Sequence, residues 1–242
     1  MLTIAALASC GALFGAAIPL IQRAGIGRKT VDQCVAEFGP AVYARLAPAF
    51  KKAGVVYPPE RLVFVGLKTE RELQVCAAGL DGAFKFIKSY PILGASGTLG
   101  PKLRQGDGQV PEGVYAIGSL NPNRRYHLSL RISYPNGFDL QYARREHRTN
   151  LGGDIMIHGG EASAGCLAVG DEAAEDLFVL AAWTGLYNIR VVLCPMDFRD
   201  ADVPAQSSRP AWVRQLYCNL SDALESLPRP AALSAKIAER EH

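Results

Sequence analysis

A histidine and a cysteine lie eight positions apart in a glycine-rich stretch of this 242-residue chain. Residues 155–158 have the pattern of a short strand, with Ile155 and Ile157 on one face and Met156 and His158 on the other. A small-residue loop then leads to Cys166. An imidazole can accept the proton of a thiol, and the resulting ion pair lowers the thiol pKa. The spacing therefore predicts a cysteine nucleophile activated by a histidine base.

The loop between these two residues has the composition that such chemistry needs. Gly159 ends the strand, and Gly165 lets the backbone approach a ligand closely, so that amides there can donate to a developing oxyanion. Ser163 is placed to orient the loop or the imidazole. The alternative interpretation is a strand histidine that bonds a backbone carbonyl and a cysteine that is merely buried.

Three segments resemble the L,D-transpeptidase catalytic-domain family, which are cysteine enzymes that remodel bacterial peptidoglycan. The family pattern of His-Gly followed by Ser-x-Gly-Cys stands here as His158-Gly159 and Ser163-Ala164-Gly165-Cys166. Residues 105–115 are similar to the family segment Gly-Asp-x-x-Thr-Pro-Glu-Gly-x-Tyr, and residues 126–139 to the branch with a short His-to-Cys loop. The resemblance extends over about residues 61–198.

This resemblance implies a fold that is mostly β with α: a mixed β-sandwich or open barrel, with one helix after the cysteine loop and helical extensions at both ends. It implies that His158 is the base and that Cys166 attacks the carbonyl of an L-configured centre in a diaminopimelate-type stem peptide, forming a thioester. No metal or organic cofactor is expected. An amine that resolves the thioester makes a transpeptidase, whereas water makes a hydrolase that trims stems or detaches wall-bound lipoprotein. A non-catalytic cell-wall-binding protein is the alternative from another class.

Several residues are candidates for holding the substrate. Many relatives have a second histidine and an arginine where this chain has Ala164 and Ala168. Six arginines can replace the missing one: Arg124, Arg125, Arg131, Arg144, Arg145 and Arg148. Alternation over residues 126–134 places Tyr126, Leu128, Leu130, Ile132 and Tyr134 on one strand face and His127, Ser129, Arg131 and Ser133 on the other. We take His127, Tyr134 and Arg131 as candidates for substrate binding.

The N-terminal residues indicate export. Residues 1–22 carry no charge and are long enough for a signal or membrane anchor, and Cys10 follows a lipoprotein-like Leu-Ala-Ser sequence. A periplasmic or cell-envelope location follows, with membrane attachment through the N-terminus as one alternative. A net charge of +3, without a basic run interleaved with aromatic residues, indicates no nucleic-acid partner.

Four regions are predicted along the chain. Residues 1–22 are the export signal or anchor, 23–60 a helical extension, 61–198 the catalytic domain, and 199–242 a linker with a C-terminal helix. The apolar residues of that last helix recur at helical spacing, which predicts one face that docks on the domain or contacts a partner: Trp212, Val213, Leu216, Tyr217, Leu220 and Leu224. Pro40 and Pro48 predict two short helices in the extension, and Asp171 is expected to be the N-cap of the helix that follows the cysteine loop.

The other cysteines allow two interpretations. Cys34, Cys76, Cys194 and Cys218 can form disulfides in an exported protein, in three pairings, or stay as buried thiols. The histidines and Cys166 match no zinc-binding spacing, and the sequence has no Cys-x-x-Cys pair.

Overall fold

A mixed, strongly curved β-sheet is the centre of the computed structural model, which describes residues 28–124, 127–200 and 210–230. The nine strands of these residues run in the order β3-β2-β1-β9-β5-β6-β7-β8-β4. Their bounds are β1 Leu62–Leu67, β2 Glu72–Ala78, β3 Phe84–Pro91, β4 Gly94–Ala95, β5 Gly113–Arg124, β6 His127–Ile132, β7 Met156–His158, β8 Leu167–Ala168 and β9 Ile189–Cys194. The predicted export segment, Cys10, Arg125, Tyr126 and residues 201–209 of the predicted linker lie outside the described residues.

The sheet combines local hairpins with two parallel pairings. Strand β2 pairs antiparallel with β1 and β3. Parallel pairing joins β1 to β9 and β7 to β8. The long strand β5 pairs with β9 near its beginning and with β6 further along, so one strand connects the two halves of the sheet. The fold is mostly β with α, and its sheet is mixed in strand direction. This confirms the predicted fold class.

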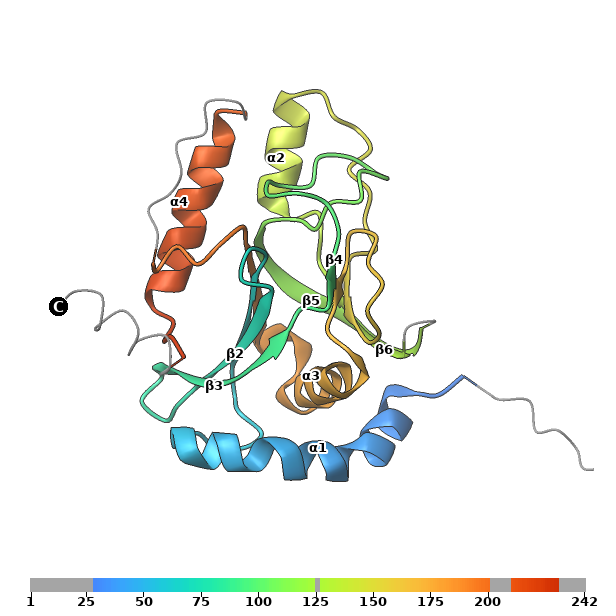
Figure 1. The fold of residues 1–242 in the computed structure, drawn as a ribbon, viewed down its shortest axis with the longest axis vertical. Coiled ribbons are helices and arrows are strands. Elements are labelled where there is room, and N and C mark those ends of the chain that lie inside the picture. The colour runs from blue at the N-terminus through green and yellow to red at the C-terminus, as the bar shows by residue number, and fades with distance from the viewer. Residues whose placement is uncertain (1–27, 125–126, 201–209, 231–242) are drawn as a thin grey trace, which may run out of the picture.

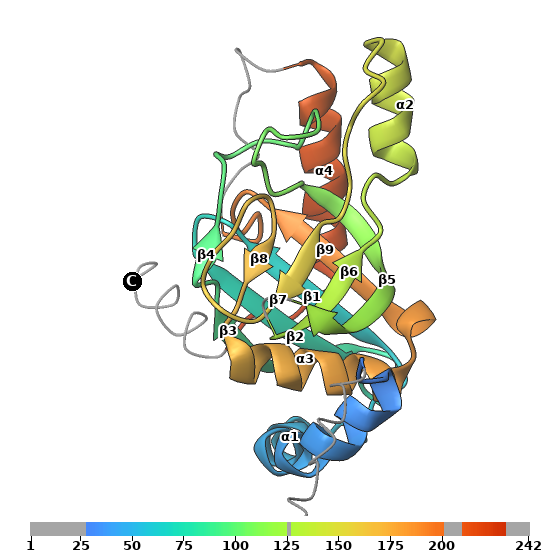
Figure 2. The same cartoon turned by 90° about the vertical axis from the view of Figure 1, so that its right-hand side faces the viewer.

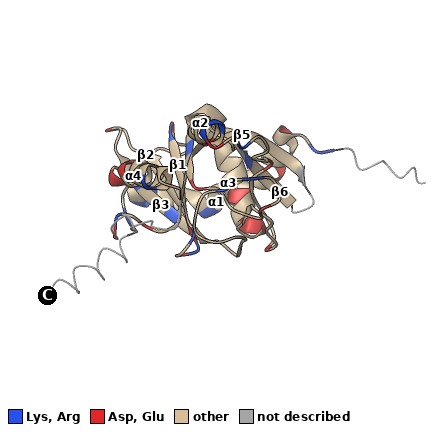
Figure 3. Ribbon diagram, turned by 90° about the horizontal axis from the view of Figure 1, so that it is seen from above, with Lys and Arg blue, Asp and Glu red and all other residues tan. Residues whose placement is uncertain are grey.

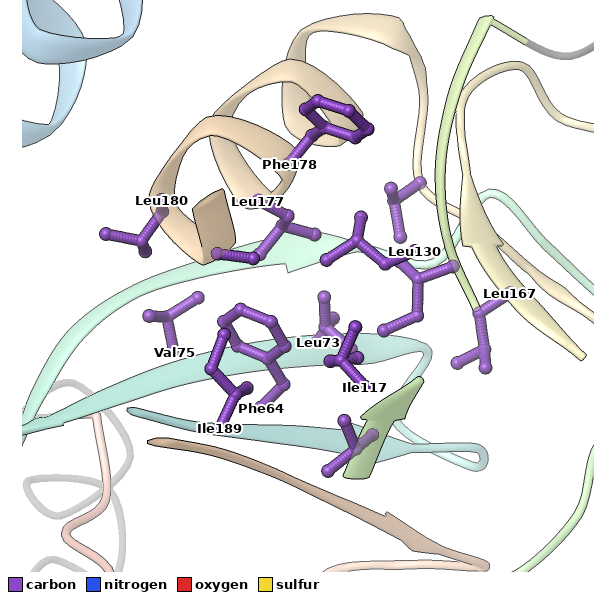
Figure 4. Packing of buried hydrophobic residues seen from close by; sticks show 14 of the residues in the cluster. Phe64, Leu73, Val75, Ile117, Leu130, Leu167, Leu177, Phe178, Leu180 and Ile189 are labelled. Carbon is purple, nitrogen blue, oxygen red and sulfur yellow. The ribbon is translucent and has the colours of Figure 1, made fainter. Parts of the chain in front are cut away.

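One face of this sheet packs on the helix that follows the cysteine loop, α3 (Asp171–Thr184), with a further helix, α1 (Val31–Ala53), beyond it. Figures 1 and 2 show this layering of sheet, α3 and α1. In Figure 4, Leu177 of α3 points toward Leu130 of the sheet, Leu167 lies beyond Leu130, and Phe178 lies on the same helix as Leu177. All four side chains are buried in one hydrophobic cluster that also contains Ile157 of β7, so α3 fixes the strands that precede and follow the cysteine loop.

The described part of the extension, from residue 28 on, contains a single α-helix, not the two that its prolines predict. Thr30 caps α1 with a capping box and Gly54 ends it in the left-handed conformation. An internal proline costs a helix about 3 kcal/mol. Here a buried stripe that belongs to the main core offsets that cost: Cys34, Val42, Leu46 and Phe50. Figures 1 and 2 show the helix bent rather than broken.

Charged contacts also attach α1 to α3. The Asp176 carboxylate of α3 is fully buried and accepts hydrogen bonds from Arg45 Nε at 2.7 Å and from the Tyr90 hydroxyl at 2.9 Å, while Lys88 Nζ lies at 3.3 Å. A buried carboxylate requires such partners. Elsewhere basic and acidic residues are interspersed over the ribbon (Figure 3).

Two helices, α2 (Gly137–Arg145) and α4 (Trp212–Glu225), stand together at the end of the molecule away from α1 (Figure 1). The sequence predicts α4 but not α2, which begins with a capping box between Asn136 and Asp139. The apolar face of α4 is buried against the sheet, as its helical spacing predicts: Trp212, Val213, Leu216, Tyr217, Leu220 and Leu224.

The expected N-cap of α3 is wrong by one residue. Gly170 occupies that position, with a φ of 81°, and Asp171 is the first helical residue. The Asp171 carboxylate instead accepts a hydrogen bond from the Gly160 amide at 2.8 Å. The aspartate therefore holds the beginning of the cysteine loop rather than the helix terminus.

Candidate active site

A small cavity of about 190 Å³ opens on the face of β6, β7 and β8 opposite to α3. Both His158 and Cys166 line it, together with Ser129, Asp154, Met156, Ala162, Ser163 and Ala164. In β7, Met156 and His158 face the cavity, while Ile157 is buried in the core with Ile155 just before the strand. The alternation predicted for this strand is confirmed, and it places the imidazole and the thiol in one pocket.

The His158 ring is oriented by its own neighbour in the chain. Its Nδ1 lies 2.6 Å from the Gly159 carbonyl oxygen, and the side chain is almost fully buried. A carbonyl only accepts hydrogen bonds, so Nδ1 carries the proton. In the neutral ring Nε2 then has the lone pair, which is the state a general base needs. The alternative interpretation expected a histidine that bonds a backbone carbonyl, and this contact is present. The same ring nevertheless lines the cavity that contains Cys166.

Cys166 differs from the buried cysteines of the chain. It is partly exposed and its Sγ donates to the Asp154 carbonyl oxygen at 3.8 Å. Burial raises the pKa of Cys76 to about 12 and that of Cys194 well above its usual value, so both thiols stay protonated at neutral pH. The five cysteines of the described residues are all free thiols. Cys34, Cys76 and Cys194 are buried, as the second interpretation of the cysteine pattern expects, whereas Cys218 is partly exposed.

Two serines hold the loop that carries the cysteine. The Gly165 amide donates to Ser96 Oγ at 2.6 Å, and Ser163 Oγ donates to the Cys166 carbonyl at 2.7 Å. The Ser96 amide in turn donates to Ser163 Oγ at 3.2 Å, and Ser96 Oγ donates to the Gly108 carbonyl at 2.6 Å. These bonds fix the peptide groups on both sides of the Gly165–Cys166 link, in agreement with a supporting role for Ser163.

Gly165 has a backbone conformation that favours glycine. Its φ is 101°, and an added Cβ would lie 3.3 Å from the Gln109 carbonyl oxygen. Because its amide donates to Ser96, Gly165 supports the loop in this structure rather than offering that amide to the pocket. Gly159 has a different contact: its carbonyl oxygen orients the His158 ring.

The three candidates for substrate binding lie in different places. Arg131 is half-exposed at the rim of the pocket, where its Nε lies 3.5 Å from Asp154 Oδ1. Tyr134 is buried away from the pocket, and its hydroxyl donates to the Lys102 carbonyl at 3.2 Å. Desolvation raises the pKa of Tyr134. Only Arg131 is therefore close to the lining residues.

His127 lies on the helix side of the sheet. Its Nε2 is 3.1 Å from Glu175 Oε1 of α3, and its ring packs edge-on against Phe38 of α1 with centroids 5.4 Å apart. The strand alternation fails here because His127 has a φ of 64° beside an irregularity in the β5–β6 ladder. The prediction that His127 shares a face with Ser129 and Arg131 is wrong.

Among the other arginines considered, Arg148 lines a second, larger cavity of about 700 Å³ together with His147 and Arg104. Arg145 lies over the Tyr142 ring on α2. Within the described ranges no group of three or more histidines, cysteines or acidic residues is placed to hold a metal ion.

Sequence reasoning missed two serines of this site. Ser96 is 67 positions from Ser163, and nothing in its local sequence signals the contact. Ser129 was assigned to the face of Arg131, but its position opposite His158 depends on the β6–β7 register. Pairing register between distant strands is not readable from one sequence.

A histidine and a cysteine in one pocket form the kind of pair in which a base can activate a thiol. The model of the YkuD family, described as the L,D-transpeptidase catalytic domain, matches residues 55–190. The chain belongs to this L,D-transpeptidase family, which confirms the resemblance seen in the sequence.

Curated relatives agree with that assignment. The Escherichia coli (strain K12) protein named "Putative L,D-transpeptidase YafK" is 32% identical over 165 residues, covering 66% of this chain and 61% of the relative. The protein of the same name from Escherichia coli O157:H7 matches equally well. The chain thus spans less than two thirds of the length of these relatives.

Solved structures of lower similarity were also found. The helical cell shape determining protein Pgp2 from Campylobacter jejuni has a TM-score of 0.46 and 21% identity, over 69% of this chain and 56% of that chain. Bd1075 from Bdellovibrio bacteriovorus has a TM-score of 0.41 and 22% identity, over 60% of this chain and 52% of that chain. The family assignment rests on the family match alone.

Proposed function

We propose that this protein is a cysteine acyltransferase that acts on peptidoglycan stem peptides. The observation that carries the proposal is that His158 and Cys166 line one pocket while the Gly159 carbonyl holds Nδ1 as the protonated nitrogen. His158 Nε2 accepts the thiol proton. The Cys166 sulfur attacks the carbonyl of the L-centre of a diaminopimelate-type residue and forms a thioester. His158 then returns the proton to the nitrogen of the leaving amine.

The thioester is resolved by a second nucleophile. An incoming amine forms an amide, releases the sulfur and yields a cross-linked or protein-modified stem. Water instead yields a free carboxylate, and the protein acts as a hydrolase that trims stems or detaches wall-bound lipoprotein. The two outcomes share the acylation step, so that step is the one to test first.

A cell-envelope location accompanies this function, because the substrate is the cell wall. Within the described residues no helix combines the length and the apolar character needed to cross a membrane. Attachment through residues 1–22, or through a lipid on Cys10, remains a proposal drawn from the sequence.

The proposal is tested by intact-mass measurement of the full chain mixed with a tetrapeptide stem fragment. We expect a mass increase equal to the acyl portion of the fragment, lost on treatment with hydroxylamine and absent in Cys166→Ala. Cys218→Ser is the matched control, because Cys218 is the other partly exposed cysteine of the described residues. An adduct that persists in Cys166→Ala contradicts the assignment of the nucleophile.

The absence of any adduct in the wild-type protein favours the non-catalytic wall-binding alternative. In that case the rate of Cys166 alkylation should equal that of a model thiol, and His158→Ala should leave it unchanged. If an adduct forms, product analysis after adding an amine acceptor separates the transpeptidase from the hydrolase.

A further inference from the structure

Ser129 has a hydroxyl that the fold buries without a partner. Its Oγ has no hydrogen-bond partner among the described residues, and the residue is fully buried. Buried hydroxyls in proteins are almost always hydrogen-bonded, because leaving one unpaired is costly. Unlike the other two unpaired side-chain atoms of the described residues, on Tyr57 and Thr184, this one borders the pocket of Cys166.

The strand register places Ser129 beside the proposed base. Ser129 of β6 is directly opposite His158 of β7, and His158 is opposite Ala168 of β8, two residues after the cysteine. Side chains directly opposite in neighbouring strands have Cβ atoms about 5 Å apart. Neighbouring strands are spaced by about 4.8 Å, so β6 lies about 10 Å from β8, with β7 between them. Ser129 therefore flanks His158 on the side away from the cysteine loop.

The substrate nitrogen also has to lie beside the imidazole. The base exchanges protons with the sulfur during attack and with the amine during departure or arrival, so the nitrogen also needs a place within reach of the imidazole. A hydroxyl next to the imidazole can accept a hydrogen bond from the N–H that is not transferred. It thereby holds the nitrogen in the orientation that the proton transfer requires.

We propose, on the basis of the function proposed above, that Ser129 binds the amine side of the substrate. In acylation Ser129 Oγ accepts an N–H of the scissile amide while the S–C bond forms, the C–N bond breaks and His158 gives its proton to the leaving nitrogen. In aminolysis it accepts one N–H of the incoming amine, whose other proton goes to His158 as the C–N bond forms. The thiolate then leaves and is protonated by the imidazolium.

The test compares two acyl donors with the same acyl group. One is a stem-peptide amide, whose leaving nitrogen needs the proton, and the other is the corresponding nitrophenyl ester, whose leaving group needs none. For Ser129→Ala we expect the rate of thioester formation to fall about ten- to hundredfold with the amide, because loss of positioning has effects of that size. With the ester the rate should stay within about twofold of wild type, an expectation that follows from the same positioning argument.

Two further variants separate binding from folding. Ser129→Thr keeps the hydroxyl and should restore most of the amide activity. Ser133→Ala is the matched control. Ser133 Oγ accepts a hydrogen bond from the Ala116 amide at 2.9 Å, and the residue does not line the pocket. The Tm of Ser129→Ala should equal or exceed that of wild type, since the substitution removes an unpaired buried hydroxyl.

The outcomes distinguish the two proposals. If Ser129→Ala slows both donors equally, or leaves the amide rate unchanged, the inference on Ser129 is overturned although the wild-type thioester forms. If the wild-type protein forms no thioester with either donor, the proposed function itself fails. That result is obtained without any change at Ser129, so it is distinct from a failure of the inference on Ser129.

Discussion

Gly94→Ala should disable the cysteine loop from outside the pocket. Gly94 lies in the edge strand β4, opposite Ala168. A Cβ at this position would overlap the Glu161 carbonyl oxygen and lie 3.0 Å from its carbon and 3.3 Å from Ala168 Cβ. The Glu161 atoms belong to the backbone, so no rotamer change relieves the overlap. Either β4 or the loop between His158 and Cys166 has to move instead, and we expect the loop to move because β4 is paired with β8.

The size of the effect follows from that displacement. Removing the overlap requires a shift on the order of 1 Å, and a misplacement of that size can cost about 100-fold in rate. Overpacking in a tight interior typically costs about 1–3 kcal/mol, which for a chain of this length lowers Tm by about 2–4 °C per kcal/mol. We expect the rate of thioester formation to fall by about two orders of magnitude. The stability loss should be moderate.

Intact-mass kinetics and thermal unfolding measure the two effects separately. Gly137→Ala is the matched control, since a Cβ there meets nothing within 4 Å and the residue has no positive φ. It should leave the acylation rate unchanged. Wild-type acylation by a correctly folded Gly94→Ala protein would refute the view that β4 determines the position of the cysteine loop.

Three other changes test separate features of the fold. Ser96→Ala removes the acceptor of the Gly165 amide and should slow thioester formation about tenfold by intact-mass kinetics, because the loop loses positioning; an unchanged rate would contradict this. Tyr217→Phe removes a 2.8 Å bond to the buried Glu112 carboxylate and should lower the free energy of unfolding in urea by about 1.5–3 kcal/mol, and a loss below measurement error would contradict it. Desolvation raises the pKa of Asp139 to about 6, so the folded state binds this proton more tightly than the unfolded state does. The free energy of unfolding should therefore fall as pH rises from about 4 to 7. Urea titrations over that range should show this slope in wild type and lose it in Asp139→Asn.

The sequence was sufficient for the parts of the site that local patterns encode. The alternation of residues 155–158 predicted which side chains of β7 face the pocket, and the spacing of α4 predicted its buried face. Both patterns reflect contact with one continuous apolar surface, and such contact leaves a periodic trace in the chain. The family motif around Cys166 carried the fold class.

Other features depend on contacts between distant segments. His127 departs from its strand pattern because its own backbone is left-handed, beside an irregularity in the β5–β6 ladder. Its side chain therefore lies against Glu175 and Phe38. The continuity of α1 through Pro40 depends on burial against α3, which overrides the local preference of proline. Neither effect has a signal in the neighbouring residues.

The C-terminal helix α4 is a further case in which contacts between distant segments are not visible in the sequence. The sequence suggests a linker followed by a docked helix, yet Tyr217 of α4 donates to Glu112 Oε2 deep in the protein. The other oxygen of that carboxylate accepts the Gly100 amide at 2.7 Å and binds Lys68 Nζ at 2.9 Å. Lys68 also donates to the carbonyls of Thr98, Gly100 and Val110. The carboxylate is fully buried, so losing any one of these donors leaves part of its hydrogen-bonding capacity unmet.

This network connects α4 to the loop that supports the segment carrying Cys166. Residues 98–112 include Gln109, whose carbonyl oxygen would lie 3.3 Å from a Cβ on Gly165, and Gly108, whose carbonyl accepts the Ser96 hydroxyl. A chain truncated before Trp212 would lose the Tyr217 donor and expose the apolar surface that α4 covers. We therefore expect truncation to weaken the support of the cysteine loop as well as the stability of the sheet. By this reasoning α4 is a structural part of the catalytic domain rather than an appendage to it.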